Sequence, residues 1–363
     1  MPTPSVLSPR SPVWLHRRAR RAALRLVLGS VGLTMVGPIG LTAGSAAGSS
    51  PAAAPLLAHW VPYRHLPGVV DIAGPRWDGS FSVAAAGRLF LLDRSGVVRP
   101  FARGRSGYST ARGPEPYITV AGGEANPASA CSFRSDTTFA IEPSQSPGVI
   151  AVDGLGRAHR FADLPSGARP NGITFDSVGR FGHRLLVSSA HQGGTTVFAL
   201  DCRGTLSTIT ANAPVIEGGM VVAPASFGSF GGDLIAPDEG SGRIFAVTPS
   251  GRTTLVARSP LPSGPDIGVE SAGFVPMSFD RRGMAFLADR FSPGNAHPGT
   301  NNLLRLPASE LVKAGVRPGD LLVAGEGGAQ TIFVRCSNTC TVRHIADGPA
   351  VAHAEGHIAF TTG

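Results

Sequence analysis

The chain has 363 residues, a formal net charge of +8 and a hydrophobic fraction of 42%. The charged fraction of only 15% excludes a chain that is disordered through high charge and low hydropathy. Glycine and proline number 48 and 31 and follow no collagen period, so the composition is rich in turns and argues against a helical bundle.

The first 47 residues differ in composition from the rest. They contain six arginines and no acidic residue, then an apolar run from Leu24 to about Leu41, then Ser45-Ala46-Ala47. A basic start, an apolar centre and a small-residue exit predict a cleavable secretory signal. A retained membrane anchor is the alternative, but glycine and proline interrupt the apolar run and disfavour a stable span. We expect a secreted, extracellular protein that meets the membrane only through this export segment.

Removal of these arginines lowers the net charge from +8 to +2, which takes away the argument for a nucleic-acid partner. Residues 48–66 are rich in alanine, proline, serine and glycine and predict a flexible linker. Residues 67–363 are then expected to form a single domain, which we expect to be monomeric.

From residue 67 the chain consists of short alternating or apolar runs separated by Gly, Asp and Pro, which is typical of β-strands. A four-strand unit recurs. In one copy the strands are expected at residues 171–175, 184–189, 195–201 and 205–210, and the next copy follows about 47 residues later. Second strands are expected to begin near residues 81, 137, 185, 233, 284 and 320.

Such a repeat predicts an all-β β-propeller. A β-sandwich or a β-helix is the alternative, but the strands of a sandwich do not repeat a four-strand unit. Six blades are favoured over five, although the last unit lacks a clear inner strand. The first unit also lacks one, and we expect the C-terminal residues 357–360 to fill that gap and close the ring.

The innermost strands begin with an acid or an amide, and in a propeller these starts face one mouth of the central channel. The residues are Glu115, Asn171, Glu217, Glu270 and Glu355. Converging carboxylates repel one another unless a cation or raised pKa values relieve the repulsion. Oxygen ligands suit a hard divalent ion such as Ca²⁺. The alternative is that strand starts are polar only because they leave the core. Glycine follows three of the five residues and permits close approach.

Loops that join second to third strands open on the same mouth and would surround a small-molecule ligand there. The candidate ligand-binding residues are Asp238, Glu239, Arg290, His297 and Glu326, and the candidate proton carriers are Asp289, His191 and His353. His353, Glu355 and His357 are spaced by two, so all three would share one face of an extended strand. A metal or acid–base role and a merely flanking role for the two histidines are both open.

Four cysteines follow the export segment, an even number that reads as disulfides in an exported protein. Cys336 and Cys340 bracket a turn and predict a bridge that closes a hairpin, which leaves Cys131 and Cys202 to pair with each other. A zinc-thiolate site is the alternative, but there is no second close pair of cysteines.

The motif Pro170-Asn171-Gly172-Ile173-Thr174-Phe175-Asp176 resembles the gluconolactonase and regucalcin-like six-bladed propellers. This resemblance implies a divalent ion held in the channel by Glu, Asn and Asp, and hydrolysis of lactones with an Asp as base. Asn171 matches the family Asn, and Glu115 or Glu355 could stand for the Glu. Glu217 occupies the position of the expected Asp, a departure that puts the lactonase chemistry in doubt.

Two functions from different classes are compatible with these features. One is a metal-dependent hydrolase of lactones or small esters, in which the ion polarises the carbonyl. The other is a non-catalytic extracellular sensor or binding propeller for a sugar, a peptide or a protein partner, since propellers serve both roles. The sequence has no Gly-x-Ser-x-Gly elbow, no His-Glu-x-x-His motif and no Walker A loop.

Overall fold

The computed structural model describes residues 57–102, 115–143 and 146–361. The predicted export segment and the first part of the predicted linker lie outside these residues. All the described residues belong to the compact unit that begins at Ala54. They are almost all in strands and turns, with one short helix, α1 (Ala308–Lys313), and two 3₁₀ turns, Pro127–Ser129 and Gly228–Phe230. None of the helices in the described part of the chain is long and apolar enough to span a membrane.

Four sheets of four strands follow one another along the chain, and we call them the first to fourth blades. The first blade has β3 (Val69–Ala73), β4 (Phe81–Ala85), β5 (Arg88–Leu92) and β6 (Val98–Ala102). The second has β7 (Ile118–Val120), β10 (Thr138–Glu142), β11 (Gly148–Val152) and β12 (Ala158–Asp163). The third has β13 (Pro170–Phe175), β14 (Leu185–His191), β15 (Gly194–Leu200) and β16 (Leu206–Ala213). The fourth has β17 (Val221–Val222), β18 (Leu234–Asp238), β19 (Arg243–Val247) and β20 (Thr253–Arg258).

The remaining blade strands form one nine-stranded sheet that divides into two blades, because its halves are joined only where Ala272 pairs with His357. The fifth blade has β21 (Val269–Phe274), β24 (Leu321–Gly325), β25 (Thr331–Cys336) and β26 (Cys340–Asp347), with β1 (Ala58–His59) at its outer edge. The sixth has β27 (Ala354–Phe360), β22 (Met284–Asp289), β23 (Asn302–Pro307) and β2 (Val61–His65). A separate two-stranded ribbon pairs β8 (Ala125–Asn126) with β9 (Cys131–Ser132).

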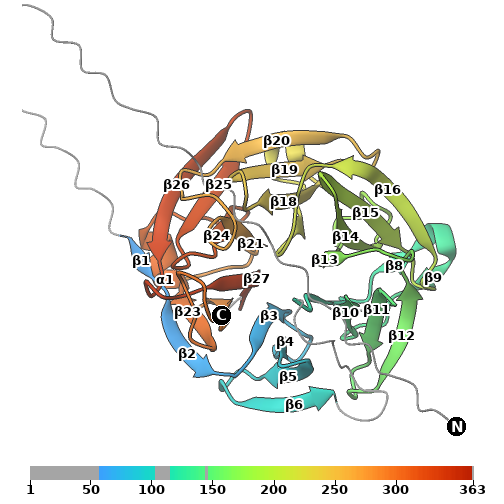
Figure 1. The fold of residues 1–363 in the computed structure, drawn as a ribbon, viewed down its shortest axis with the longest axis horizontal. Coiled ribbons are helices and arrows are strands. Elements are labelled where there is room, and N and C mark those ends of the chain that lie inside the picture. The colour runs from blue at the N-terminus through green and yellow to red at the C-terminus, as the bar shows by residue number, and fades with distance from the viewer. Residues whose placement is uncertain (1–56, 103–114, 144–145, 362–363) are drawn as a thin grey trace, which may run out of the picture. The chain divides into compact units, whose positions relative to one another are not determined.

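The blades are arranged around a common centre in a propeller-like fold, which confirms the predicted all-β class (Figure 1). Strands β3, β13, β21 and β27 lie nearest the centre, and β6, β12, β16 and β20 lie on the outside (Figure 1). The second strands begin within one residue of the predicted positions. The pairing gives six four-stranded groups, the larger of the two blade numbers predicted.

Two expectations about the chain ends were wrong in detail. The first blade has its own inner strand, β3, and the C-terminal strand β27 is the inner strand of the sixth blade instead. The predicted linker 48–66 also extends too far, because residues 58–59 and 61–65 pair at the outer edges of the fifth and sixth blades. One blade therefore combines the C-terminal strand with a strand from the start of the domain, and this closes the ring.

Burial follows the position of a strand within its blade. The second strands are almost completely buried, as in β4 and β24, because neighbouring blades cover both of their faces. Outer strands are more exposed, and in β12 the residues His159, Arg160 and Asp163 lie in water. The apolar clusters lie between adjacent blades. Between the second and third blades, for example, Phe139 and Phe175 pack edge to face at 5.4 Å.

Both predicted disulfides are present, and all four cysteines are paired, so the zinc-thiolate alternative was wrong. Cys131–Cys202 joins the ribbon strand β9 to the turn after β15, and Cys336–Cys340 closes the β25–β26 hairpin. Two disulfides indicate an oxidising compartment.

Candidate functional site

β-bulges aim the polar starts of two inner strands. The register shifts by one residue at Asn171, where β13 pairs with β14, and at Glu270, where β21 pairs with β24. An extra residue in one strand bends that strand and re-aims its side chain. In the first blade the same shift falls on Val70, an apolar residue. The first blade therefore supplies no acid at this position of its inner strand.

Backbone hydrogen bonds tie the inner-strand starts of the third, fourth and fifth blades together. Gly218 N donates to Asn171 O at 2.9 Å, and Gly219 N donates to Glu270 O at 3.1 Å. Gly218 has a φ of +66°, and a Cβ there would lie 2.3 Å from Glu270 Cγ. Glycine after Glu217 is thus required for this close approach, as the sequence suggested.

Six carboxylates gather at this mouth, and we call them the acid cluster: Glu115, Glu217, Glu239, Glu270, Glu326 and Glu355. Possible ligand oxygens of Glu115, Glu270 and Glu355 lie within 4.8 Å of one another, as do those of Glu239, Glu270 and Glu326. Glu217 is linked to the rest by repulsion from Glu355. The predicted convergence of inner-strand acids is therefore present in the structure, while the metal-binding role of each residue stays a prediction.

Tyr117 lies between two of these acids and is completely buried. Its hydroxyl oxygen is 2.5 Å from Glu270 Oε1 and 2.7 Å from Glu355 Oε2. One hydroxyl proton cannot serve both carboxylates, so a second proton must be shared within this group. Burial, with repulsion from Glu355, raises the pKa of Glu270 well above its usual range, which favours its protonated form.

Arg290, the first residue after β22, brings positive charge to the cluster. Its guanidinium forms ion pairs with Glu115 and with Glu355 Oε1, the latter at 2.9 Å. Burial alone would raise the pKa of Glu355, which is 1% exposed, but the hydrogen bond from His353 and the charge of Arg290 lower it. The ionised form of Glu355 is consequently favoured within the acid cluster.

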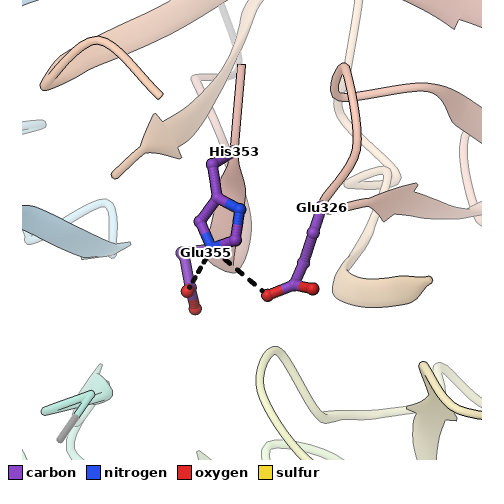
Figure 2. A group of neighbouring side chains, drawn as sticks. All are labelled: Glu326, His353 and Glu355. Atoms are coloured by element: carbon purple, nitrogen blue, oxygen red, sulfur yellow. Dashed lines mark ion pairs between the residues drawn. The ribbon is translucent and has the colours of Figure 1, made fainter. Parts of the chain in front are cut away.

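His353 and Glu326 face each other across the mouth from different elements (Figure 2). His353 Nε2 lies 3.3 Å from Glu355 Oε1 and 3.4 Å from Glu326 Oε1. Both side chains are buried, yet His353 Nδ1 has no hydrogen-bond partner, and Glu326 Oε2 has none besides the neighbouring carboxyl groups of Glu239 and Glu270. Buried polar atoms without partners are costly and therefore point to a missing ligand.

The excess of negative charge shifts several pKa values. Burial and repulsion from Glu355 raise the pKa of Glu326 to about 10 and that of Glu115 to about 7. Burial and repulsion from Glu217 raise the pKa of Glu239 to about 7. Burial also raises the pKa of Glu217, which hydrogen bonding with Asn171 opposes. Without a cation the cluster holds protons at neutral pH.

Other predicted site residues are engaged elsewhere. Asp289 is buried and accepts hydrogen bonds from Thr300 and from His353 N, so it holds the two ends of the 290–300 loop rather than facing the acid cluster as a free base. His191 is exposed at the β14–β15 turn, where its ring contacts carbonyl oxygens of Gln192 and Ala211. Neither fits the proton-carrier position that was expected of it.

Three other predicted residues, Asp238, His297 and Asn171, form contacts of their own. Asp238 is buried, binds Ser241 and repels Glu217. His297 Nδ1 lies 2.7 Å from Ala350 O. His297 also lines a cavity of about 340 Å³ together with Gly327 and Gly328, the two residues that follow Glu326 in the chain. Asn171 is occupied by Ser188, whose hydroxyl donates to Asn171 Oδ1 at 2.9 Å.

A second polar group lies further along the inner strands, and the sequence prediction missed it. Asp71 accepts hydrogen bonds from Ile118 N and His357 N, both at 2.7 Å, and lies 3.0 Å from His357 Nδ1. His357 Nε2 lies 3.2 Å from Met220 O, so both ring nitrogens face acceptors and the ring is held as imidazolium. Burial would lower the pKa of His357, but Asp71 raises it overall.

The expected grouping of His353, Glu355 and His357 on one strand face was therefore wrong. Pairing of β27 with β22 is irregular around Gly356, which has a φ of +70°, and a Cβ there would lie 2.3 Å from Asp71 Oδ1. His353 and Glu355 belong to the acid cluster, and His357 pairs with Asp71. An acid inside the apolar run Val69-Val70-Asp71-Ile72 was the signal in the sequence for this pair.

Comparisons with known proteins extend the description of the fold. No protein-family model and no curated protein matches this chain. A chain of a nidogen/laminin complex superimposes with a TM-score of 0.50 at 10% identity, covering 82% of this chain and 87% of that chain, which shows a shared fold. This chain is also similar to a streptogramin B lyase, with a TM-score of 0.46, 14% identity and coverages of 84% and 92%.

A regucalcin from Agrobacterium tumefaciens, described as a calcium-binding protein, is similar to this chain as well. Its TM-score is 0.46 at 12% identity, with 81% of this chain and 79% of that chain covered. This is a likeness to the family that the motif at residues 170–176 resembles, and at this identity it concerns the fold alone.

Proposed function

We propose that the acid cluster binds a divalent cation, with Ca²⁺ as the first candidate, and that the protein is an exported hydrolase of lactones or small esters. The observation that carries the proposal is the buried Glu326 Oε2, which has no partner besides neighbouring carboxyl groups, in a group of three carboxylates whose ligand atoms lie within 4.8 Å. Ca²⁺ takes six to eight oxygen ligands in flexible geometry, which this donor set suits.

Glu239, Glu270 and Glu326 would hold the ion, with Glu217 beside them. The raised pKa values of all four acids support this assignment, because a bound cation would replace the protons that they otherwise retain. Arg290 already neutralises the other side of the cluster through Glu115 and Glu355. A bound cation would polarise a substrate carbonyl.

His353 is the residue we assign to proton transfer. Its Nε2 lies between Glu326 and Glu355, which orient the ring, and its Nδ1 is free of protein partners. Asp289, at the start of the 290–300 loop, fixes the His353 backbone and acts as a positioning residue. The small-molecule ligand would enter at the exposed edge of the cluster, where Glu115 is 36% exposed.

A non-catalytic binding propeller is the second candidate, and a specific observation favours it. Both oxygens of Asp289 accept hydrogen bonds, so this candidate proton carrier is not free to act as a base. In that case the same mouth would hold a ligand without converting it.

Metal analysis and melting curves of the purified mature protein test the cation. We expect about one Ca²⁺ per chain and a lower melting temperature in EDTA, because a ligand at 100 times its Kd contributes about 2.7 kcal/mol. Glu326→Gln should abolish the response to Ca²⁺, whereas Glu310→Gln, an exposed acid on α1, should keep it. If EDTA leaves the wild-type melting temperature unchanged, the cation site is wrong.

A panel of γ- and δ-lactones and small esters tests the hydrolase. Turnover that stops in EDTA and falls at least about 100-fold in His353→Gln supports hydrolysis with His353 as proton carrier. Metal binding without turnover of any panel member would overturn the hydrolase and support the binding propeller.

A further inference from the structure

The end of the channel opposite the acid cluster carries a large aromatic side chain in water. Trp77, in the turn between β3 and β4, is 84% exposed, whereas Trp60 is 2% exposed. Exposed tryptophan is depleted on surfaces without a partner and enriched at binding sites. Inner strands begin at the acid cluster and end here, so this surface is separate from the proposed cation site.

The backbone of the Trp77 turn is held in place. Arg76 N donates to Ser80 O, and Gly79 N donates to Arg76 O, both at 2.8 Å. Trp77 N donates across to the second blade, to Asp136 Oδ1, at 3.0 Å. A ring presented on a fixed turn loses little conformational entropy when a ligand stacks on it.

Two adjoining cavities border this turn. One, of about 380 Å³, is lined by Trp77, Thr119, Glu124, Asp136 and neighbouring residues. The other, of about 180 Å³, lies at the ends of the inner strands and includes Phe274 and His357. Both are lined by Gly74, Pro75 and Thr119, so the two cavities are neighbours, and we call the pair the hollow. Its size suits a small ligand with more than one ring.

The residues that line the hollow favour some classes of ligand over others. The carboxylates of Glu124 and Asp136 can accept hydrogen bonds from hydroxyl groups and would repel an anion. The Arg76 guanidinium is already engaged, because it donates to Asp136 O at 2.9 Å and stacks over the Phe101 ring. Trp77 is the single aromatic residue of the described lining of the larger cavity, whereas grooves for proline-rich peptides are lined by several.

We propose that this hollow binds a neutral oligosaccharide, with one sugar ring stacked on Trp77 and hydroxyl groups bound by Glu124 and Asp136. A sugar ring presents an apolar face to the indole and hydroxyls at its edge, which matches one flat ring beside carboxylate acceptors. The proposal does not depend on the cation site.

Tryptophan fluorescence gives a direct test, because the chain has three tryptophans and only Trp77 is exposed among the two that the structure describes. In a full-length Trp14→Phe background, acrylamide quenching is measured with maltohexaose, cellohexaose and chitohexaose, and calorimetry gives each Kd. We expect at least one of these sugars to shield Trp77 from acrylamide and to shift its emission to shorter wavelength.

Variants assign the binding to this hollow. In calorimetry, Trp77→Ala should weaken binding at least about tenfold, Trp77→Phe less, and Glu124→Gln about threefold. Leu155→Ala, a change at another exposed apolar residue that does not line the hollow, should leave Kd unchanged. Melting curves confirm folding of each variant, and Trp77→Phe provides the comparison if Trp77→Ala does not fold.

Several results would contradict the oligosaccharide site. Absence of binding by all three neutral sugars, or binding that Trp77→Ala and Trp77→Phe both leave unchanged, overturns the proposal. Protection of Trp77 by sulfated oligosaccharides or by a proline-rich peptide, but by no neutral sugar, also overturns it. EDTA should not change sugar binding, so this result is independent of the outcome at the acid cluster.

Discussion

The channel contains two buried polar groups that differ in how well their atoms are partnered. Asp71 and His357 form a pair in which the carboxylate accepts from the backbone and the ring, and both ring nitrogens face acceptors. In the acid cluster, His353 Nδ1 has no partner, Glu326 Oε2 has only neighbouring carboxyl groups, and the carboxylates outnumber the nearby cations. A buried group with every atom satisfied stabilises the fold, and one left incomplete is prepared for a ligand.

The two groups also differ in how the backbone presents them. Bulges aim Asn171 and Glu270 at the mouth, at some cost to regular pairing. Asp71 instead follows the bulged Val70 and binds the backbone of the next blade at Ile118. Asp71 therefore links three blades, whereas the acid cluster mainly lines a space between them.

We expect the largest loss of stability when the Asp71–His357 pair is broken. Asp71→Ala leaves His357 and several backbone donors without a partner inside the protein. We expect a loss of about 3–5 kcal/mol in the free energy of unfolding, as measured by urea denaturation. Asp280→Asn, which breaks the exposed Asp280–Arg282 pair, is the control and should leave stability unchanged. A small loss in Asp71→Ala would remove the distinction between the two groups.

The second effect is the pH dependence of the acid cluster in EDTA. Folding raises the pKa values of Glu115 and Glu239 to about 7 and of Glu326 to about 10. An acid with a raised folded pKa contributes most stability below its unfolded pKa of about 4.5 and loses it as pH rises through the folded value. We expect a loss of about 2 kcal/mol between about pH 5 and pH 8.

Calcium should reduce this dependence, because a cation replaces the protons of the cluster. Urea titrations at each pH, with Ca²⁺ or EDTA, provide the measurement. Stability that is flat across this range in EDTA would mean that the carboxylates do not interact as the structure indicates.

The third effect concerns His357. Since Asp71 raises the pKa of His357, the pair contributes its full stability below about pH 6.5 and loses it as pH rises through the folded value. His357→Gln keeps a donor for Asp71 but no titrating ring. We expect it to cost about 1–2 kcal/mol near pH 6 and less near pH 9. An equal cost at both pH values would argue against a charged His357.

The smallest effect is a gain. In EDTA at about pH 8, Glu326 stays protonated in the folded protein and ionises when the chain unfolds, which favours unfolding. Glu326→Gln removes this contribution and should stabilise the protein by about 1 kcal/mol. In saturating Ca²⁺ the same variant should be less stable than wild type, because it loses the ion. Equilibrium unfolding under both conditions provides the comparison, and the same sign of change in both would contradict a ligand role for Glu326.

Local patterns predicted much of this molecule. Turn residues at regular spacing located every second strand, and the acids at the starts of inner strands predicted the acid cluster. Both signals can be read from short stretches of sequence. A strand buried between blades must be apolar, and a strand start at the channel mouth can be polar.

Features that depend on contacts between blades were not predicted. Whether Asp71 is satisfied depends on Ile118 and His357, which lie 47 and 286 positions away along the chain. Tyr117 meets Glu270 and Glu355 only after three blades have come together. Asp289, an acid at the end of a strand, was expected to carry protons, and only its contacts with Thr300 and His353 show that its carboxylate is already engaged.

The order of strands in the last two blades affects how the chain can fold during synthesis. The chain enters the fifth blade with β21, crosses to the sixth for β22 and β23, returns for β24 to β26, and ends in the sixth with β27. The first four blades can each form as their residues leave the ribosome. The fifth blade has all its strands once Asp347 has emerged, but the sixth lacks its inner strand β27 until Phe360 has emerged, so a chain that stops shortly before Ala354 leaves the ring open at one blade.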